Sequence, residues 1–223
     1  MSYAIAIDGP AGAGKSTIAK FLAKELELIY VDTGALYRAI GYYMVNNGIA
    51  IDDDAAVVAA LDGVRVSLAH VDGVQRVFVN DEDVSDRIRT PQISMAASRV
   101  SAIPAVRAFL LNLQRDIAAT HSVIMDGRDI GTTILPNADV KIFLTASPEA
   151  RAERRYKELI EKGESVTFED VLADMVKRDY DDAHRAASPL RKADDAIEVD
   201  TGDLTLEESI AAMKAVILEN LPK

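Results

Sequence analysis

The chain has 223 residues, of which 49% are hydrophobic, and it carries a formal net charge of −11. This acidic balance counts against nonspecific duplex binding, which needs a surface field that attracts phosphate. The lack of cysteine excludes disulfides and thiolate metal sites. No apolar run approaches the ~20 residues of a membrane-spanning helix, and the N-terminus lacks the basic flank of a secretory signal. We therefore expect a cytoplasmic protein that binds neither nucleic acid nor membrane.

Short apolar segments rich in Val and Ile alternate with helical patterns along the chain. The segments, typical of parallel strands covered on both faces, are residues 3–8, 28–32, 123–126, 140–144 and 196–200. Helical patterns cover residues 15–26, 35–46, 104–119 and 147–162, and capping signals mark Ser147, Thr167 and Thr205. The alternation predicts an α/β fold with a five-stranded parallel sheet flanked by helices.

One stretch interrupts this alternation. Residues 64–80 alternate with period two on either side of Asp72-Gly73, which is a strong two-residue hairpin signal. We therefore expect a small inserted subdomain at residues 62–90, within a core domain made of residues 1–61 and 91–223.

The segment "GPAGAGKS" follows the first predicted strand and opens a predicted helix, as a phosphate-binding P-loop does. Its glycines let backbone N–H groups surround phosphate oxygens, and the helix N-terminus adds its positive dipole end. Lys15 can reach the β- and γ-phosphates, and the Ser16 hydroxyl can ligate Mg²⁺. The motif predicts a nucleoside triphosphate site formed by Gly9, Pro10, Ala11, Gly12, Ala13, Gly14, Lys15, Ser16 and Thr17.

Two further motifs lie at strand ends, where ligands bind an open parallel sheet. "DTGALYR" provides Thr33, Tyr37 and Arg38, and "DGRDIGT" provides Arg128 and Asp129. Arg38 either faces a phosphate or is an ordinary solvated arginine. The glycines around Arg128 and Asp129 favour a functional loop over a surface ion pair.

The C-terminal half contains two groups of arginines at helical spacing. Arg151, Arg154 and Arg155 share one face of a predicted helix, where their mutual repulsion favours a lid over about residues 147–165 that closes on phosphates. The alternative is a face neutralised by neighbouring glutamates. Arg178, Asp182 and Arg185 are also spaced to share a helical face, from which they could grip an acceptor's phosphate and ribose.

These motifs, together with the hairpin and "SPLRKADDAIEVDT", resemble those of bacterial cytidylate kinases over nearly the whole chain and in the same order. The resemblance implies a P-loop kinase fold and direct transfer of the γ-phosphate of ATP to CMP or dCMP with Mg²⁺. Compact kinases of this kind often act as monomers, so we expect a monomer.

The resemblance also implies a role for individual residues. Arginines matching Arg38, Arg128 and Arg178 hold the acceptor's phosphate in that family, Ser98, Arg107 and Asp129 read the cytosine ring, and Asp182 and Arg185 lie near the ribose. The expected catalytic residues are Lys15, Arg128, Arg178 and Arg154, with Ser16 as metal ligand. The P-loop, Arg151 and Arg155 are expected to bind the donor. The expected acceptor-binding residues are Thr33, Tyr37, Arg38, Ser98, Arg107, Arg128, Asp129, Arg178, Asp182 and Arg185.

The residues by themselves leave other functions open. A P-loop and an arginine-rich lid also suit a kinase for UMP or shikimate. A nucleotide-dependent switch or a non-enzymatic nucleotide-binding module would contain a P-loop as well. The chain lacks the N-K-x-D motif that reads guanine, which counts against a GTPase switch.

Overall fold

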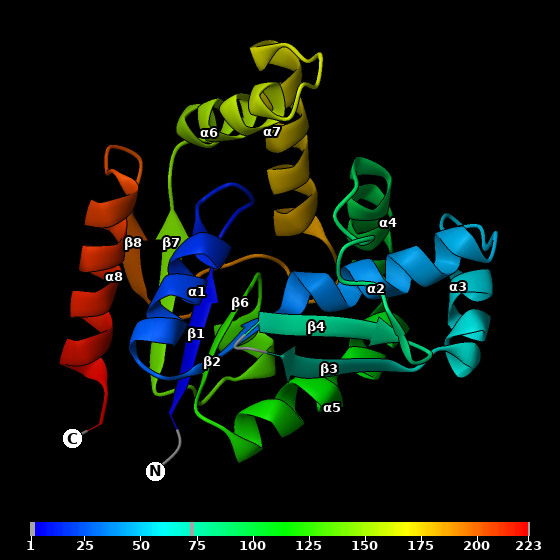
Figure 1. Ribbon diagram of the computed structural model, residues 1–223, viewed down its shortest axis with the longest axis horizontal. Coiled ribbons are helices and arrows are strands. Elements are labelled where there is room, and N and C mark those ends of the chain that lie inside the picture. Colours follow the sequence, from blue (N-terminus) through cyan, green and yellow to red (C-terminus); the bar gives the residue numbers. More distant parts are fainter. Residues whose placement is uncertain (1–2, 72–73, 223) are drawn as a thin grey trace.

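The computed structural model describes residues 3–71 and 74–222 (Figure 1). The elements run in the order β1 (Ala4–Asp8), α1 (Lys15–Glu25), β2 (Ile29–Asp32), α2 (Thr33–Asn46), α3 (Asp54–Ala60), η1 (Leu61–Gly63), β3 (Val66–Val71), β4 (Val74–Val79) and β5 (Glu82–Asp83). They continue with α4 (Pro91–Ser101), α5 (Pro104–Thr120), β6 (Val123–Gly127), η2 (Ile130–Ile134), β7 (Val140–Thr145), α6 (Pro148–Glu161), α7 (Phe168–His184), β8 (Ile197–Asp200) and α8 (Leu206–Asn220).

The central sheet is parallel and has the strand order β2-β6-β1-β7-β8, which confirms the five predicted strands. In its register Asp32 lies opposite Asp126, and Asp8 lies opposite Gly127. The carboxyl ends of β1, β2 and β6 therefore meet at one edge of the sheet, together with the loops that follow them.

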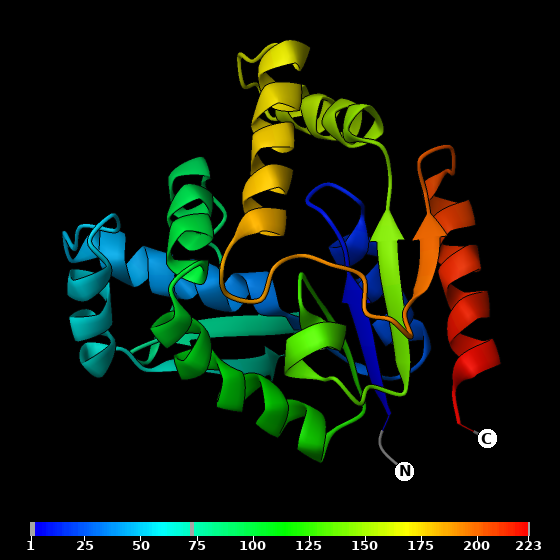
Figure 2. The same cartoon turned by 180° about the vertical axis from the view of Figure 1, so that it is seen from behind.

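Helices cover both faces of this sheet, as alternating burial along its strands requires. Ile5 and Ile7 of β1 belong to the core that includes Ile18 of α1 and Met213 of α8. Ala6 points the other way, into a core that η2 shares and against which α5 packs. Figures 1 and 2 show α1 and α8 on one face and α5 on the opposite face.

The inserted segment forms a second, antiparallel sheet of β3, β4 and β5. Strands β3 and β4 pair from Val66–Val79 to Val71–Val74, as the hairpin signal predicted, while the turn at Asp72-Gly73 lies outside the described residues. Their inner side chains share one core with α2, α4 and α5. The domain boundaries at 62–90 stay a prediction.

The helix caps follow the sequence closely. Ser147 caps α6 by accepting a hydrogen bond from the Ala150 N–H, at 3.1 Å. Thr205 and Glu208 form a complete capping box on α8. Thr167 caps α7, since its hydroxyl accepts from the Asp170 N–H at 3.1 Å. The capping box is incomplete there, because the Asp170 carboxylate accepts from the Thr167 hydroxyl and not from the Thr167 backbone N–H. Helices α6 and α7 lie beyond the carboxyl ends of β1 and β7 (Figure 2).

No single helix within residues 3–71 and 74–222 is long and apolar enough to cross a membrane. The pair α4 and α5 passes that test only when its two helices, bent by 98°, are counted together.

Gly41 sets the distance between α2 and α4. A Cβ at this position would lie 2.9 Å from the Ala97 nitrogen and 3.1 Å from the Ala96 Cβ, so it would meet backbone and not a flexible side chain. We expect Gly41→Ala to lower the free energy of unfolding by about 1–2 kcal/mol, because overpacking outweighs the gain in helix propensity. Chemical denaturation measures this change. A variant as stable as the parent would contradict the close packing of these helices.

Candidate active site

The P-loop turns from the end of β1 into the start of α1. Gly9 has a φ of +150°, and a Cβ there would lie 2.0 Å from the carbonyl oxygen of Leu144 on β7. Only glycine fits this position, so the loop passes close to the neighbouring strand before it curves back. Gly14, with a φ of +89°, is the N-cap of α1 and offers no side-chain cap. The first N–H groups of the helix are thus left for a ligand.

Lys15 is the first residue of α1 and is only 5% exposed. Its ammonium donates to the Pro10 carbonyl within the loop, at 2.6 Å. Burial, followed by the positive charge of Arg128, lowers its pKa well below the ordinary value. The P-loop lysine and the loop after β6 therefore lie close enough to interact electrostatically.

Asp126, at the end of β6, is the centre of a buried polar cluster. One carboxylate oxygen accepts from the Ser16 hydroxyl at 2.8 Å, and the other accepts from the Tyr30 hydroxyl at 2.8 Å. Burial and the nearby charge of Asp32 raise the pKa of Asp126. A hydroxyl and a carboxylate are oxygen donors of the kind that Mg²⁺ prefers, so these residues fit that ion.

Asp32, at the end of β2, connects the central sheet to the inserted segment. Its carboxylate caps α2 and accepts from Arg38 at 2.9 Å and from Arg89 at 3.1 Å. The side-chain oxygen of Gln75 on β4 accepts from the Asp32 N–H at 2.9 Å. The neighbouring Thr33 hydroxyl donates to the Asp126 carbonyl, at 2.7 Å.

Arg128 leaves the loop after β6 and pairs with Asp182 of α7, with 2.9 Å between Nε and Oδ2. Although burial opposes it, the charge of Arg128 holds the pKa of Asp182 below its ordinary value. Desolvation, followed by the positive charges of Arg128, Arg38 and Arg155, lowers the pKa of Arg178. The three arginines predicted to bind one phosphate are therefore close together, although they come from three separate elements.

Asp129 and Arg107 form a buried ion pair between the β6 loop and α5. The Arg107 guanidinium also lies 5.5 Å from the ring centre of Tyr37, and burial raises the pKa of Tyr37 to about 12. Arg185 approaches Asp129 to 3.6 Å. Ser98 lies half-buried on α4, and its backbone carbonyl accepts a hydrogen bond from the Ser101 hydroxyl at 2.8 Å.

Arg185 lies at the end of the helix that carries Arg178 and Asp182. Helix α7 ends at His184, and Arg185 is its C-cap residue. The Arg185 guanidinium lies 3.7 Å from the carboxylate of Asp182, three positions earlier, as the predicted spacing requires. Beyond the helix, Ser188 has a positive φ.

The three arginines of α6 have different surroundings. Arg151 is buried and donates to Asp179 of α7 at 2.5 Å and to the Ala11 carbonyl of the P-loop at 3.0 Å. Arg154 bonds to the Thr201 carbonyl after β8. Arg155 is paired with Glu158 at 2.7 Å, which is the neutralised arrangement that the sequence left open.

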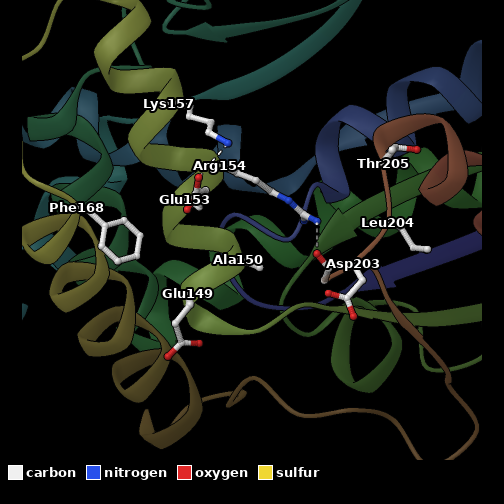
Figure 3. A pocket seen from close by; sticks show the side chains of 10 residues that line it. Glu149, Ala150, Glu153, Arg154, Lys157, Phe168, Asp203, Leu204 and Thr205 are labelled. Carbon is white, nitrogen blue, oxygen red and sulfur yellow. Dashed lines mark hydrogen bonds and ion pairs between the residues drawn. The ribbon is translucent and has the colours of Figure 1, made fainter.

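A pocket of about 450 Å³ lies between α6 and the loop that joins β8 to α8 (Figure 3). In Figure 3 Arg154 extends from α6 toward the loop that carries Asp203 and Leu204. Arg154 is the only predicted site residue that lines the pocket. The P-loop residues do not line this pocket.

Sequence reasoning did not assign a role to several residues that hold the site together. Tyr30, Gln75 and Arg89 each bond to one of the strand-end aspartates. Asp8 accepts from two backbone N–H groups of the β6 loop. Only Asp8 had a visible signal, since it stands directly before Gly9 at a strand end.

A P-loop on a five-stranded parallel sheet, faced by clustered arginines, defines this chain as a P-loop phosphotransferase. The cytidylate kinase family model matches residues 5–219, so the chain belongs to that family and is an enzyme. The resemblance seen in the sequence is thereby confirmed.

Known relatives agree with this assignment. The chain is 49% identical over 213 residues to a cytidylate kinase of Carboxydothermus hydrogenoformans, covering 96% of each chain. It is 48% identical over 220 residues to one from Leuconostoc mesenteroides, covering 99% of this chain and 98% of that one. An uncharacterized protein from Eubacterium ventriosum has a solved structure with a TM-score of 0.50 and 15% identity, covering 96% of this chain and 98% of that one. That last likeness concerns the fold alone.

Proposed function

We propose that this enzyme transfers the γ-phosphoryl group of ATP to CMP or dCMP, giving ADP and CDP or dCDP. A phosphate oxygen of the acceptor attacks the γ-phosphorus in line, and the bond from that phosphorus to the bridging oxygen of ADP breaks. The acceptor phosphate is already an anionic nucleophile, so the transfer requires no general base.

The observation that carries this proposal is the convergence of positive charge between the P-loop and the β6 loop. The positive charges of Arg128, Arg38 and Arg155 lower the pKa of Arg178. The charge of Arg128 also lowers the pKa of Lys15. Among residues 3–71 and 74–222, the Arg38 Nε is a buried donor without a hydrogen-bond partner. Buried donors normally have partners. Two polyanions held end to end would fill this site and offset the repulsion within it.

We propose that the acceptor's phosphate binds to Arg38, Arg128 and Arg178, near the Thr33 hydroxyl. All three arginines present planar donor groups, which suit phosphate oxygens better than an ammonium does. Arg38 and Arg128 are held in place by Asp32 and Asp182, respectively.

The proposed cytosine site consists of Ser98, Arg107 and Asp129, with Tyr37 beside Arg107. Cytosine has a donor at N4 and acceptors at O2 and N3, which a carboxylate, a guanidinium and a hydroxyl can match. Uracil would place an acceptor against the carboxylate where cytosine places a donor, so the pocket favours cytosine. Arg185 and Asp182 are proposed to bind the ribose, and the buried Nη2 of Arg185 has no hydrogen-bond partner among the described residues, although it lies 3.6 Å from Asp129.

The proposed donor site is the P-loop from Gly9 to Thr17. Lys15 would move from the Pro10 carbonyl to the β- and γ-phosphates, and Ser16 would hold Mg²⁺, with Asp126 next to it. When bound, Mg²⁺ neutralises charge on the phosphate oxygens. Lid arginines 151, 154 and 155 would close over the donor and exclude water that would otherwise hydrolyse ATP.

The rate of ADP release tests this function. Supplying CMP, dCMP, UMP, AMP and shikimate separately with ATP and Mg²⁺, we expect rapid release with CMP and dCMP only. Equal activity with UMP would contradict the proposed contacts to the base, but the enzyme would still be a nucleoside monophosphate kinase. Slow ADP release that no acceptor increases would favour the switch, and ATP binding without any release would favour a binding module.

We further propose that the enzyme acts as a monomer in the cytoplasm on small nucleotides, without nucleic acid or membrane partners. Sedimentation velocity of the purified protein with and without CMP tests the monomeric state.

A further inference from the structure

Asp8 is a buried charged residue that the proposed transfer leaves unused. It ends β1 and is only 4% exposed. Its two carboxylate oxygens accept from the Ile130 N–H and the Gly131 N–H, each at 2.7 Å. Burying a carboxylate costs free energy that such charge-assisted hydrogen bonds offset. A carboxylate at this position therefore needs a reason beyond packing.

The two N–H groups open the short π-helix η2, directly after Arg128 and Asp129. No side chain of the helix's own N-cap residue bonds to them. The first N–H groups of a helix have no partner inside it, so Asp8 supplies the cap from a different strand. Asp8 thereby fixes the backbone of the segment that carries the proposed phosphate and base contacts.

We propose that Asp8 is a positioning residue for the acceptor site: its ionised carboxylate holds the loop of Arg128 and Asp129 against the end of β1. This inference rests on the proposed function. The backbone of Asp8 leads directly into Gly9, so one residue sets the start of the P-loop and the place of the acceptor loop. Misplacing reactive groups by about 1 Å can cost on the order of 10²-fold in rate, which gives such a link a kinetic consequence.

The ionisation of Asp8 provides a second line of support. Burial raises its pKa to about 6, the Asp129 charge acts in the same direction, and the two N–H groups and Lys15 act against it. Protonation turns one acceptor oxygen into a donor that faces an N–H group, so one bond to the loop is lost. The folded protein takes up this proton more readily than the unfolded chain, whose carboxyl keeps the ordinary pKa near 3.8. Acidification through pH 6 therefore loosens the loop without lowering the free energy of unfolding through this group.

Asp8→Asn tests the proposal with a side chain of the same size. The amide can accept only one of the two hydrogen bonds, so we expect the KM for CMP to rise about tenfold or more at pH 7.5. The KM for ATP should change less than about twofold. Asp139→Asn is the matched control, because the Asp139 carboxylate accepts from the Ala4 N–H at 2.8 Å, at the opposite end of the same strand. We expect it to leave both KM values unchanged.

A pH profile separates positioning from simple structural support. Between pH 8 and pH 5, the KM for CMP should rise below about pH 6 in the parent and in Asp139→Asn. The phosphate of CMP itself titrates near pH 6 and contributes equally to all three enzymes. The part of the rise that is missing in Asp8→Asn therefore reports Asp8 alone.

Gly131→Ala keeps the proposal testable if Asp8→Asn does not fold. A Cβ there would lie 3.4 Å from the Asp8 Oδ2 and 3.1 Å from the Lys141 Cδ, so it crowds the contact between the loop and Asp8 and leaves the carboxylate intact. We expect a raised KM for CMP with an unchanged KM for ATP. Thermal unfolding of each variant checks that it is folded.

Three results would overturn the proposal: a KM for CMP within twofold of the parent in Asp8→Asn, an equal rise in the KM for ATP, or an unaltered pH profile. For Gly131→Ala, an unchanged KM for CMP would do the same. Each presupposes a parent enzyme that phosphorylates CMP. A parent that does not use CMP overturns the proposed function instead, so the two failures are distinguishable.

Discussion

Replacing Lys15 by alanine is expected to lower kcat by about 10²–10³-fold, the range typical of removing one group that stabilises a transition-state charge. The ammonium is buried in the P-loop, and burial and Arg128 lower its pKa because its charge is crowded. Removing a crowded charge does not weaken the core, so we expect the free energy of unfolding to be retained. Initial rates of ADP release at saturating CMP, with thermal unfolding alongside, measure both effects.

Lys24→Ala is the control for this experiment, since Lys24 lies in the last turn of the same helix and is exposed. It should leave kcat unchanged. A Lys15→Ala enzyme with a kcat within tenfold of the parent would contradict the role of Lys15 in phosphoryl transfer.

Replacing Arg128 by alanine is expected to lower kcat/KM for CMP by about 10²–10³-fold while the KM for ATP changes little. The variant loses a planar donor to the acceptor phosphate and also leaves Asp182 without its 2.9 Å partner. Arg128→Lys keeps the charge but not the forked geometry of the guanidinium, so its kcat/KM for CMP should lie between those of the parent and of Arg128→Ala. Steady-state kinetics with CMP and ATP varied in turn give these values.

Arg76→Ala is the matched control for the loss of an arginine–aspartate pair. Arg76 binds Asp83 through Nε at 2.8 Å, as Arg128 binds Asp182, but this pair lies on the inserted sheet. We expect normal kinetics from it. Equal losses in the two variants would mean that Arg128 acts through the fold and not on the acceptor.

The parts of the fold that were predicted correctly depend on local patterns. The five strands are continuous apolar runs, and the P-loop is a short motif whose glycines have a mechanical reason, as Gly9 against Leu144 shows. Helix α4 was not predicted, although Thr90 caps it, Pro91 starts it, and its buried residues Ile93, Ala96, Ala97 and Val100 have helical spacing.

The site was predictable only in part, for a related reason. Strand-end residues such as Arg38 and Arg128 could be found because parallel strands bring their carboxyl ends together. The partners of Arg128 and Asp126 could not, because these contacts join segments that are far apart in the chain. Tyr30 reaches an aspartate 96 positions along the chain, and Arg128 reaches one 54 positions along. Spacing along one element does not report such contacts.

The core that the inserted sheet shares with the neighbouring helices limits how this enzyme can be re-engineered. Val66, Val77 and Val79 pack in one cluster with Leu36 of α2 and Val100 of α4. Deleting the insertion would therefore expose the apolar sides of helices that carry Arg38 and Ser98. A graft intended to change the acceptor therefore has to transplant the inserted sheet, α2 and α4 as one block, because their buried side chains share this core.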